Sequence, residues 1–214
     1  MLGSNALADL IEAADKPNCA DPLVVVPAPD PTLLRKEGTS SIDLRLGTWF
    51  LTPKKNRHAL LDVTQPDEEQ PSEHSVTRTH FVPFGRKFYL HPHSFVLAAT
   101  LEWIRMPLRN AAYVTGKSSW GRRGLVIETA PGIHPGFSGC LTLELANVGE
   151  IPIALTPGTK ICQLFIHSVT QPSSRPGESQ HVGRRRPTLL SIRLDRFAER
   201  LALKGSAADT ENDS

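Results

Sequence analysis

The sequence has few of the features that mark a secreted or membrane-bound protein. Its three cysteines, Cys19, Cys140 and Cys162, are far apart and odd in number, which argues against a disulfide framework and favours a reducing, cytoplasmic setting. No apolar run approaches the ~20 residues of a membrane span. The first residues carry acidic Asp9 and Glu12 and lack the basic start of a signal peptide. We therefore expect no membrane partner.

An excess of one charge sign is also missing. Lys and Arg total 24 against 22 Asp and Glu, so the formal net charge is only +2. A protein that coats nucleic acid needs a stronger positive field to displace counterions from the phosphates. We therefore expect no nucleic-acid partner.

Internal repeats and an alternation of strands with helices are absent, which argues against a parallel sheet. Proline (18) and glycine (15) instead separate many short apolar runs within 214 residues. This pattern predicts a mainly all-β fold, a distorted antiparallel β-barrel or jelly roll with short helices near both termini. Residues 1–204 would form one domain, followed by a disordered tail over 205–214.

Local patterns place the elements of this fold. A helix is predicted over 4–14, capped by Ser4 or Asn5, and another over 194–204. Residues 53–77 are polar and predict a long loop or insertion. Strands are predicted over 23–26, 41–50, 87–90, 94–103, 111–115, 124–129, 139–148, 153–155 and 161–170.

The segment GKSSWGRRG (116–124) gathers hydrogen-bond donors in nine residues. Backbone N–H groups, two serine hydroxyls, one lysine and two arginines in a compact turn are what a phosphate group requires. The segment is not a P-loop, because the upstream glycine of that motif is missing. An ordinary basic surface turn is the alternative interpretation.

The strand CLTLELANV (140–148) contains one acidic residue in its middle. Leu141, Leu143 and Leu145 face one side, so Glu144 lies on the other side among small neighbours, where a pocket floor could form. The alternative is a solvated glutamate on an outer sheet face. The preceding turn, TAPGIHPGFSG, contains glycines that let backbone approach a ligand closely, or it is simply a long turn.

Histidine and cysteine give weaker indications. His91 and His93 cluster locally without an obvious third ligand, so structural or surface roles are favoured over a metal site. The zinc nucleobase-deaminase signature, H-x-E followed by P-C-x-x-C, is absent. A Cys–His catalytic pair stays open, although no motif supports one.

Taken in order, these segments resemble the dCTP deaminase branch of the trimeric dUTPase superfamily. The resemblance implies a dUTPase-like distorted barrel that forms a homotrimer with active sites between subunits. It also implies deamination of dCTP without zinc, with Mg²⁺ bound through the triphosphate. The matching segments are SSIDLRLG (40–47), FYLHPHSFVLAATLE (88–102), GKSSWGRRGL (116–125), IHPGFSG (133–139), LTLELANVGEIPIAL (141–155), PGTKICQL (157–164) and, in divergent form, GRRRPTLLSIRLDRF (183–197).

The resemblance also implies roles for individual residues. Glu144 would be the general acid/base that takes a proton from the water attacking C4 of cytosine and passes protons to N3 and to the leaving ammonia. Ser118 and Arg122 would position that water and stabilise developing charge. The residues expected to bind the substrate are Lys117, Ser119, Ala130, His134, Phe137, Thr142, Leu143, Gln180 and Arg184.

The sequence departs from the family pattern at His134, where aspartate is usual. Because dUTPases use that aspartate around their attacking water, this departure favours release of dUTP and ammonia as the final products. Two alternatives remain open: a bifunctional enzyme that continues to dUMP and pyrophosphate, and a nucleotide-binding regulatory protein with little turnover. The run from Gly124 to Thr129 is also one residue shorter than usual, and Gln180 and Arg184 stand where lysine and glutamine are usual.

Overall fold

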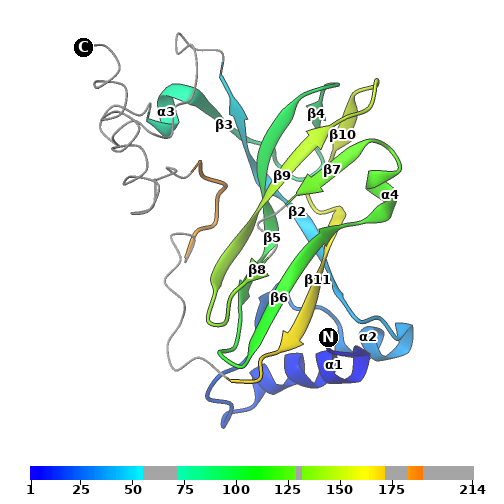
Figure 1. Cartoon of the computed structure of the whole chain (residues 1–214), viewed down its shortest axis with the longest axis vertical. Helices are drawn as coiled ribbons and strands as arrows, with labels where there is room; N and C mark the ends of the chain where they lie inside the picture. Colours follow the sequence, from blue (N-terminus) through cyan, green and yellow to red (C-terminus); the bar gives the residue numbers. More distant parts are fainter. Residues whose placement is uncertain (55–71, 129–131, 172–182, 190–214) are drawn as a thin grey trace, which may run out of the picture. The chain divides into compact units, whose positions relative to one another are not determined.

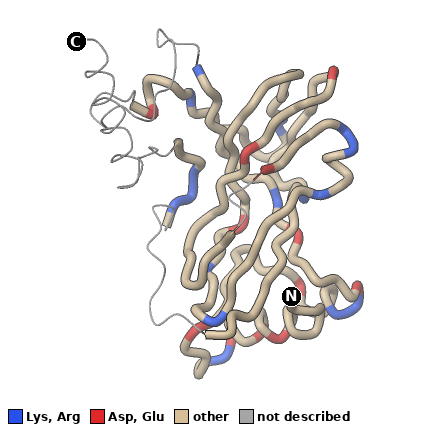
Figure 2. The backbone as a smooth tube through the Cα atoms, viewed as in Figure 1, with Lys and Arg blue, Asp and Glu red and all other residues tan. Residues whose placement is uncertain are grey.

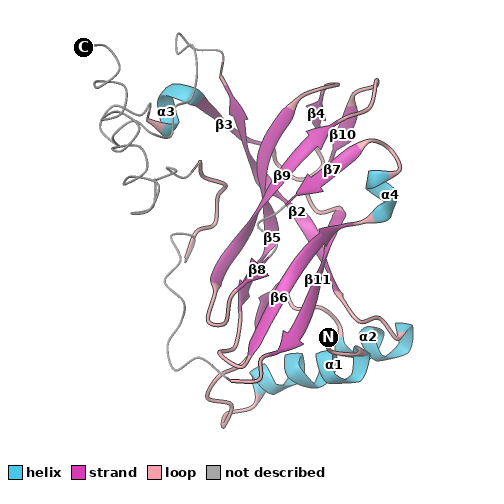
Figure 3. Cartoon of the chain, in the orientation of Figure 1, coloured by secondary structure: helices cyan, strands magenta, loops and turns pink. Residues whose placement is uncertain are grey.

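The computed structural model describes residues 1–54, 72–128, 132–171 and 183–189. These fall into two compact units, Met1–Pro53 with Arg78–Thr188, and Lys54–Thr77 with the chain from Leu189 onward. Strands dominate the first unit (Figures 1 and 3). Its strands are β1 Val24–Val26, β2 Ile42–Pro53, β3 Thr77–Phe81, β4 Phe88–Leu90, β5 Phe95–Arg105, β6 Asn110–Gly116, β7 Leu125–Glu128, β8 Gly132–Ile133, β9 Ser138–Asn147, β10 Ile153–Leu155 and β11 Lys160–Ser168.

One antiparallel sheet forms the body of the first unit. Its strand order is β7-β9-β5-β2-β11-β6-β8, with β1 added to β5 and β3 to β2, and β4 and β10 form a separate pair. The sheet curls, so that its two ends approach where Gly116 of β6 lies against Ile127 of β7. The predicted mainly β, antiparallel fold is therefore confirmed, and nine predicted strands match observed ones within a few residues.

The hydrophobic core is formed by every second side chain along the strands. In β9 the leucines at 141, 143 and 145 are buried, whereas the residues between them are partly or fully exposed. In β2, Ile42, Leu44 and Leu46 are buried in the same way. The half-buried strands that the sequence predicts here follow directly from this period of two.

Two helices lie in the N-terminal segment, at the base of the view in Figure 1. The helix α1 (Ser4–Glu12) buries Leu7, Ala8 and Ile11, as its apolar stripe predicts. The predicted cap was wrong, because Gly3 occupies the cap position and no side chain caps the helix.

The helix α2 (Pro31–Glu37) was missed by the sequence analysis, which predicted no element between the strands at 23–26 and 41–50. Asp30 caps it by accepting a hydrogen bond from the Thr32 N–H at 2.9 Å, and Pro31 opens its first turn. Gly38 ends it with a left-handed φ of 64°. All three signals were present in the sequence.

Paired irregularities bend the sheet around β5. Between Ala99 and Trp103 the register of β5 shifts against β9, and β2 shifts against β5 between Leu46 and Phe50. Extra residues of this kind bend a strand and increase its twist. The Thr100 hydroxyl fills one gap, since it accepts from the Leu141 N–H at 2.9 Å and donates to the Glu102 carbonyl at 2.9 Å.

A buried ion pair spans this bend. Glu102 is 1% exposed, and its two carboxylate oxygens accept hydrogen bonds from the Arg45 backbone N–H (2.7 Å) and guanidinium (2.9 Å). A buried carboxylate needs such donors, because desolvation without them costs several kcal/mol. The pair therefore fixes β2 against β5 at the point where both strands are irregular.

The second unit is small in its described part. The helix α3 (Glu73–Val76) anchors Lys54, whose N–H donates to the Val76 carbonyl at 2.7 Å. The Leu189 N–H donates to the Glu73 carboxylate at 2.6 Å. The predicted helix over 194–204, the tail over 205–214 and most of the predicted 53–77 loop lie outside the described residues. The single-domain boundary at 204 stays a prediction.

Helices long and apolar enough to span a membrane do not occur in the part of the chain described above.

We expect Arg45→Met to lower the free energy of unfolding by about 3 kcal/mol, because it leaves the buried Glu102 carboxylate without its charged partner. Urea denaturation would measure the change. Arg35→Met is the matched control, since Arg35 pairs with Asp9 and Glu12 at the surface and its loss should have a much smaller effect. Equal losses in the two variants would contradict this account.

Candidate active site

The GKSSWGRRG segment forms the turn between β6 and β7. The helix α4 (Ser118–Gly121) occupies its centre, with the Lys117 N–H donating to the Ile161 carbonyl of β11 at 3.0 Å. The Trp120 indole N–H donates to the Lys160 carbonyl at 3.0 Å. A four-residue helix has little stability alone, so these bonds to β11 hold it in place.

Exposed donors line this turn, as the sequence predicts. Ser118, Ser119 and Arg122 are exposed, and Lys117 is partly buried. Figure 2 shows basic residues on the α4 turn, which projects beside β7 in Figure 1. The structure therefore brings four of the predicted site residues together in one basic turn.

Glycine is required where this turn meets the next one. Gly124 has φ +85°, and a Cβ there would meet the Gly149 nitrogen at 2.9 Å. The Val148 N–H donates to the Gly124 carbonyl at 2.9 Å, so the α4 turn is tied to the turn after β9. Asn147 fixes that second turn, since its amide donates to the Ile151 carbonyl at 2.9 Å and accepts from the Gly149 N–H at 3.0 Å.

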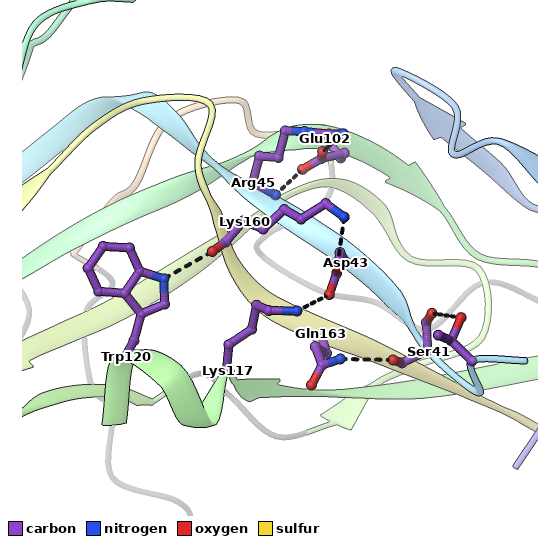
Figure 4. A network of polar contacts seen from close by, with 9 residues as sticks. Ser41, Asp43, Arg45, Glu102, Lys117, Trp120, Lys160 and Gln163 are labelled. Atoms are coloured by element: carbon purple, nitrogen blue, oxygen red, sulfur yellow. Dashed lines mark hydrogen bonds and ion pairs between the residues drawn. The ribbon is translucent and has the colours of Figure 1, made fainter. Parts of the chain in front are cut away.

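A network of three charges lies behind the α4 turn (Figure 4). Lys117 Nζ is 2.6 Å from Asp43 Oδ1, and Lys160 Nζ is 3.0 Å from Asp43 Oδ2. Burial alone would raise the pKa of the Asp43 carboxyl, but hydrogen bonds from Lys117 and Lys160 outweigh it and hold that pKa below its ordinary value. Asp43 therefore remains ionised and holds both ammonium groups.

The sequence analysis missed Asp43 and Lys160. Asp43 is 74 residues from Lys117 in the chain, so only the pairing of β2 with β11 and of β11 with β6 brings them together. The available signal was the alternation of β2, which places Asp43 on the side of the strand opposite the buried leucines.

Glu144 lies on the exposed side of β9, between the buried Leu143 and Leu145, as the strand pattern predicts. Its Cα partner on the neighbouring strand β7 is Glu128. Within the described residues, the Glu144 carboxylate makes no hydrogen bond or ion pair. A carboxylate without a partner is available to accept a proton from an incoming group.

The edge of β9 that points away from β5 is hydrogen-bonded to other backbone segments at two places. At one end, the Gly183 N–H donates to the Ser138 carbonyl at 2.6 Å and the Cys140 N–H donates to the Arg184 carbonyl at 2.8 Å. At the other end, β7 pairs with β9 from Glu144 to Asn147. Peptide groups two residues apart point to the same side of a strand. The Thr142 N–H and C=O therefore point to the same edge as those of Cys140 and Glu144, between the part bonded to 183–184 and the part paired with β7.

The segment 183–188 is held to β2 as well as to β9. The guanidinium carbon of Arg186 lies 3.8 Å from the centre of the Trp49 ring, which is a cation–π contact. Pro187 is buried. These contacts place the backbone of Arg184, one of the predicted substrate-binding residues, two residues along the edge from Thr142.

The remaining predicted residues are spread over neighbouring elements. His134 is exposed and its carbonyl accepts from the Phe137 N–H at 3.1 Å, whereas Phe137 packs partly buried against the core. Leu143 is fully buried, so only its backbone can meet a ligand. Ala130 and Gln180 lie outside the described residues. In the described part of one chain, no hydrogen bond joins Glu144 to Ser118 or Arg122.

The cysteines with shifted thiol pKa values are poorly suited to act as nucleophiles, and the described residues contain no cluster of metal-ligating side chains. Over the described ranges, no group of three His, Cys, Asp or Glu side chains could hold a metal ion. Burial raises the pKa of the Cys162 thiol to about 12 and also raises that of Cys140. A raised thiol pKa disfavours the thiolate that a cysteine nucleophile needs.

Comparisons with known proteins agree with the sequence resemblance. A family model described as dCTP deaminase-like matches residues 4–169. A Methanobrevibacter smithii protein named "dCTP deaminase, dUMP-forming" is 37% identical over 162 residues, which cover 73% of this chain and 81% of that protein. A Kocuria rhizophila protein of the same name is 40% identical over 167 residues, or 78% of each chain.

One solved structure supports the fold. The 2'-deoxycytidine 5'-triphosphate deaminase of Agrobacterium tumefaciens aligns with a TM-score of 0.54 at 18% identity, covering 78% of this chain and 47% of that one. At this identity the match supports the fold alone.

These names correct one prediction. The sequence analysis favoured dUTP as the final product because His134 replaces an aspartate. That prediction is wrong, since the curated relatives are named dUMP-forming. The sequence analysis relied too heavily on the loss of a carboxylate at position 134.

We expect Gly124→Ala to lower the free energy of unfolding by about 1–3 kcal/mol, because alanine is strained at this positive φ and its Cβ would collide with Gly149. Gly121→Ala is the control in the same turn, since a Cβ there meets nothing within 4 Å. That substitution should be neutral or stabilise by less than about 1 kcal/mol. Thermal or urea unfolding that ranks the two variants equally would contradict the proposed packing of this turn.

We expect the stabilising effect of Asp43 to depend on pH. Folding lowers the pKa of Asp43, so its contribution to the free energy of unfolding is complete at pH values above the ordinary pKa of aspartate. That contribution is lost as the pH falls through the lower pKa of the folded state. The difference in unfolding free energy between the unchanged protein and Asp43→Asn should be constant from about pH 8 to pH 5 and shrink below about pH 4. If the difference in unfolding free energy between the two proteins stayed constant in acid, the charge of Asp43 would not be the source of its stabilising effect.

Proposed function

This chain belongs to the dCTP deaminase-like family, and from that premise we propose that it converts Mg²⁺-bound dCTP into dUMP, ammonia and pyrophosphate. The first water replaces the amino group at C4 of cytosine and releases ammonia. The second water breaks the bond between the α- and β-phosphates and releases pyrophosphate. The observation that carries the proposal is the family match over residues 4–169 together with relatives named as dUMP-forming.

In the first step, Glu144 accepts a proton from the attacking water and returns protons to N3 of the base and to the leaving ammonia. The exposed, unpaired position of its carboxylate on β9 supports this role. Ser118 and Arg122 orient the water and stabilise charge on the base. The Thr142 peptide group, on the open stretch of the β9 edge, reads the edge of the base by hydrogen bonding.

The phosphates bind at the α4 turn, where Lys117, Ser119 and Arg122 supply charged and hydroxyl donors. His134 takes the place of the usual aspartate, with a ring nitrogen able to accept a hydrogen bond from the sugar 3′-hydroxyl or from the second water. Phe137 stacks on the deoxyribose. Ala130, Gln180 and Arg184 complete the predicted set of contacts.

We further propose that the active sites form between subunits of a homotrimer in the cytoplasm. Within one chain, the α4 donors and Glu144 form no hydrogen bond or ion pair with each other in the described residues. A second copy could bring its α4 turn to Glu144. Large apolar side chains that remain exposed near these elements, such as Val148 and Ile151, support burial against another copy.

The test is incubation of the purified protein with dCTP and Mg²⁺, followed by chromatographic separation of dCTP, dUTP and dUMP. We expect dUMP and pyrophosphate from the unchanged protein, and a rate at least about 100-fold lower from Glu144→Gln, because general acid–base catalysis contributes that much. Glu37→Gln, an exposed glutamate on α2, is the matched control and should keep full activity.

Two other outcomes of this assay would contradict the proposed conversion of dCTP to dUMP. Accumulation of dUTP without dUMP would show that the second hydrolysis does not occur. Nucleotide binding without any product would instead identify a regulatory binding protein.

A further inference from the structure

Lys160 begins β11, and nothing in the family resemblance gives it a role. Its ammonium shares the Asp43 carboxylate with that of Lys117, at 3.0 Å and 2.6 Å respectively. Figure 4 shows the two lysine side chains converging on Asp43. Two positive charges on one carboxylate leave one positive charge uncompensated, and an anion can therefore bind beside them.

The surroundings of Lys160 favour a ligand over a purely structural role. Its side chain is 50% exposed, against 25% for both Lys117 and Asp43. An ion pair this open to solvent contributes little to stability. The buried Glu102 does not need Lys160 either, because Arg45, the Cα partner of Lys160 on β2, already neutralises it.

The position of Lys160 links it to the α4 turn. Its carbonyl accepts the Trp120 indole N–H, and the next carbonyl along β11, that of Ile161, accepts the Lys117 N–H. The start of β11 and the start of α4 are thus bonded directly. The backbone of Lys160 therefore lies beside the turn that carries the exposed Arg122 and the serines, and its ammonium shares Asp43 with Lys117, the residue that precedes α4.

We propose that Lys160 is a second phosphate-binding lysine, which Asp43 holds beside Lys117 so that both ammonium groups receive one polyphosphate chain. This inference rests on the proposed function, since it takes the α4 turn as the phosphate end of the nucleotide site. A triphosphate carries several negative charges and is best matched by several preorganised cations. Lys160 would thereby help the protein to select a triphosphate over a monophosphate.

The experiment compares Lys160→Met with Lys160→Arg and with Lys36→Met, an exposed lysine on α2 that serves as the control. We expect Lys160→Met to raise KM for Mg²⁺-bound dCTP about tenfold while kcat changes less than about twofold, as for the loss of one charged contact to the phosphates. Lys160→Arg should recover most of the loss, and Lys36→Met should match the unchanged protein.

Calorimetric binding of inorganic tripolyphosphate separates this inference from the proposed function. Weaker tripolyphosphate binding by Lys160→Met supports the phosphate site even if the unchanged protein does not turn over dCTP, in which case only the proposed activity fails. Normal turnover with unchanged KM and unchanged tripolyphosphate binding in Lys160→Met overturns the inference and leaves the activity standing. A lower unfolding free energy with no change in either binding measurement also overturns it.

Discussion

The carboxylate of Glu102 is buried in the middle of the sheet, and its pairing with Arg45 constrains everything around it. The pair lies where β5 shifts register against β9 and where β2 shifts against β5. Without a specific contact, a bend of this kind could form at several positions along the strands, because backbone hydrogen bonding is about equally favourable in several registers. Since only one register gives Glu102 both of its donors from Arg45, the buried charge specifies the bend.

Fixing Arg45 also fixes Asp43, because the two residues lie on the same face of β2. Asp43 then holds Lys117, which begins the α4 turn, and Lys160, which begins β11. The basic turn is too short to fold independently. Its geometry therefore derives from the strands behind it, so that a structural ion pair in the core and the exposed donors of the candidate site belong to one connected set of contacts.

The sequence was sufficient for features that depend on neighbours in the chain. The alternation in β2 and β9 predicted both strands and the exposed face that carries Glu144, and the donor-rich composition of 116–124 predicted the basic turn. Features set by distant pairing were not accessible: the register shifts of β5, the sharing of Asp43 by two lysines, and the position of Glu128 opposite Glu144. The helix α2 is a different case, because its cap, its proline and its final glycine were all readable and were overlooked.

The question of the final product shows why one substitution rarely decides a reaction. An aspartate near an attacking water is useful because its oxygens accept hydrogen bonds, and a neutral imidazole also offers one acceptor nitrogen. Hydrolysis of a phosphate anhydride depends at least as much on how cations hold the phosphates in line with the water. In the function we propose, His134 changes one acceptor, whereas the cations Lys117, Arg122 and Lys160 still provide a basic setting for the phosphates. A site that keeps its phosphate cations can therefore keep its second hydrolysis when an acceptor beside the sugar is exchanged.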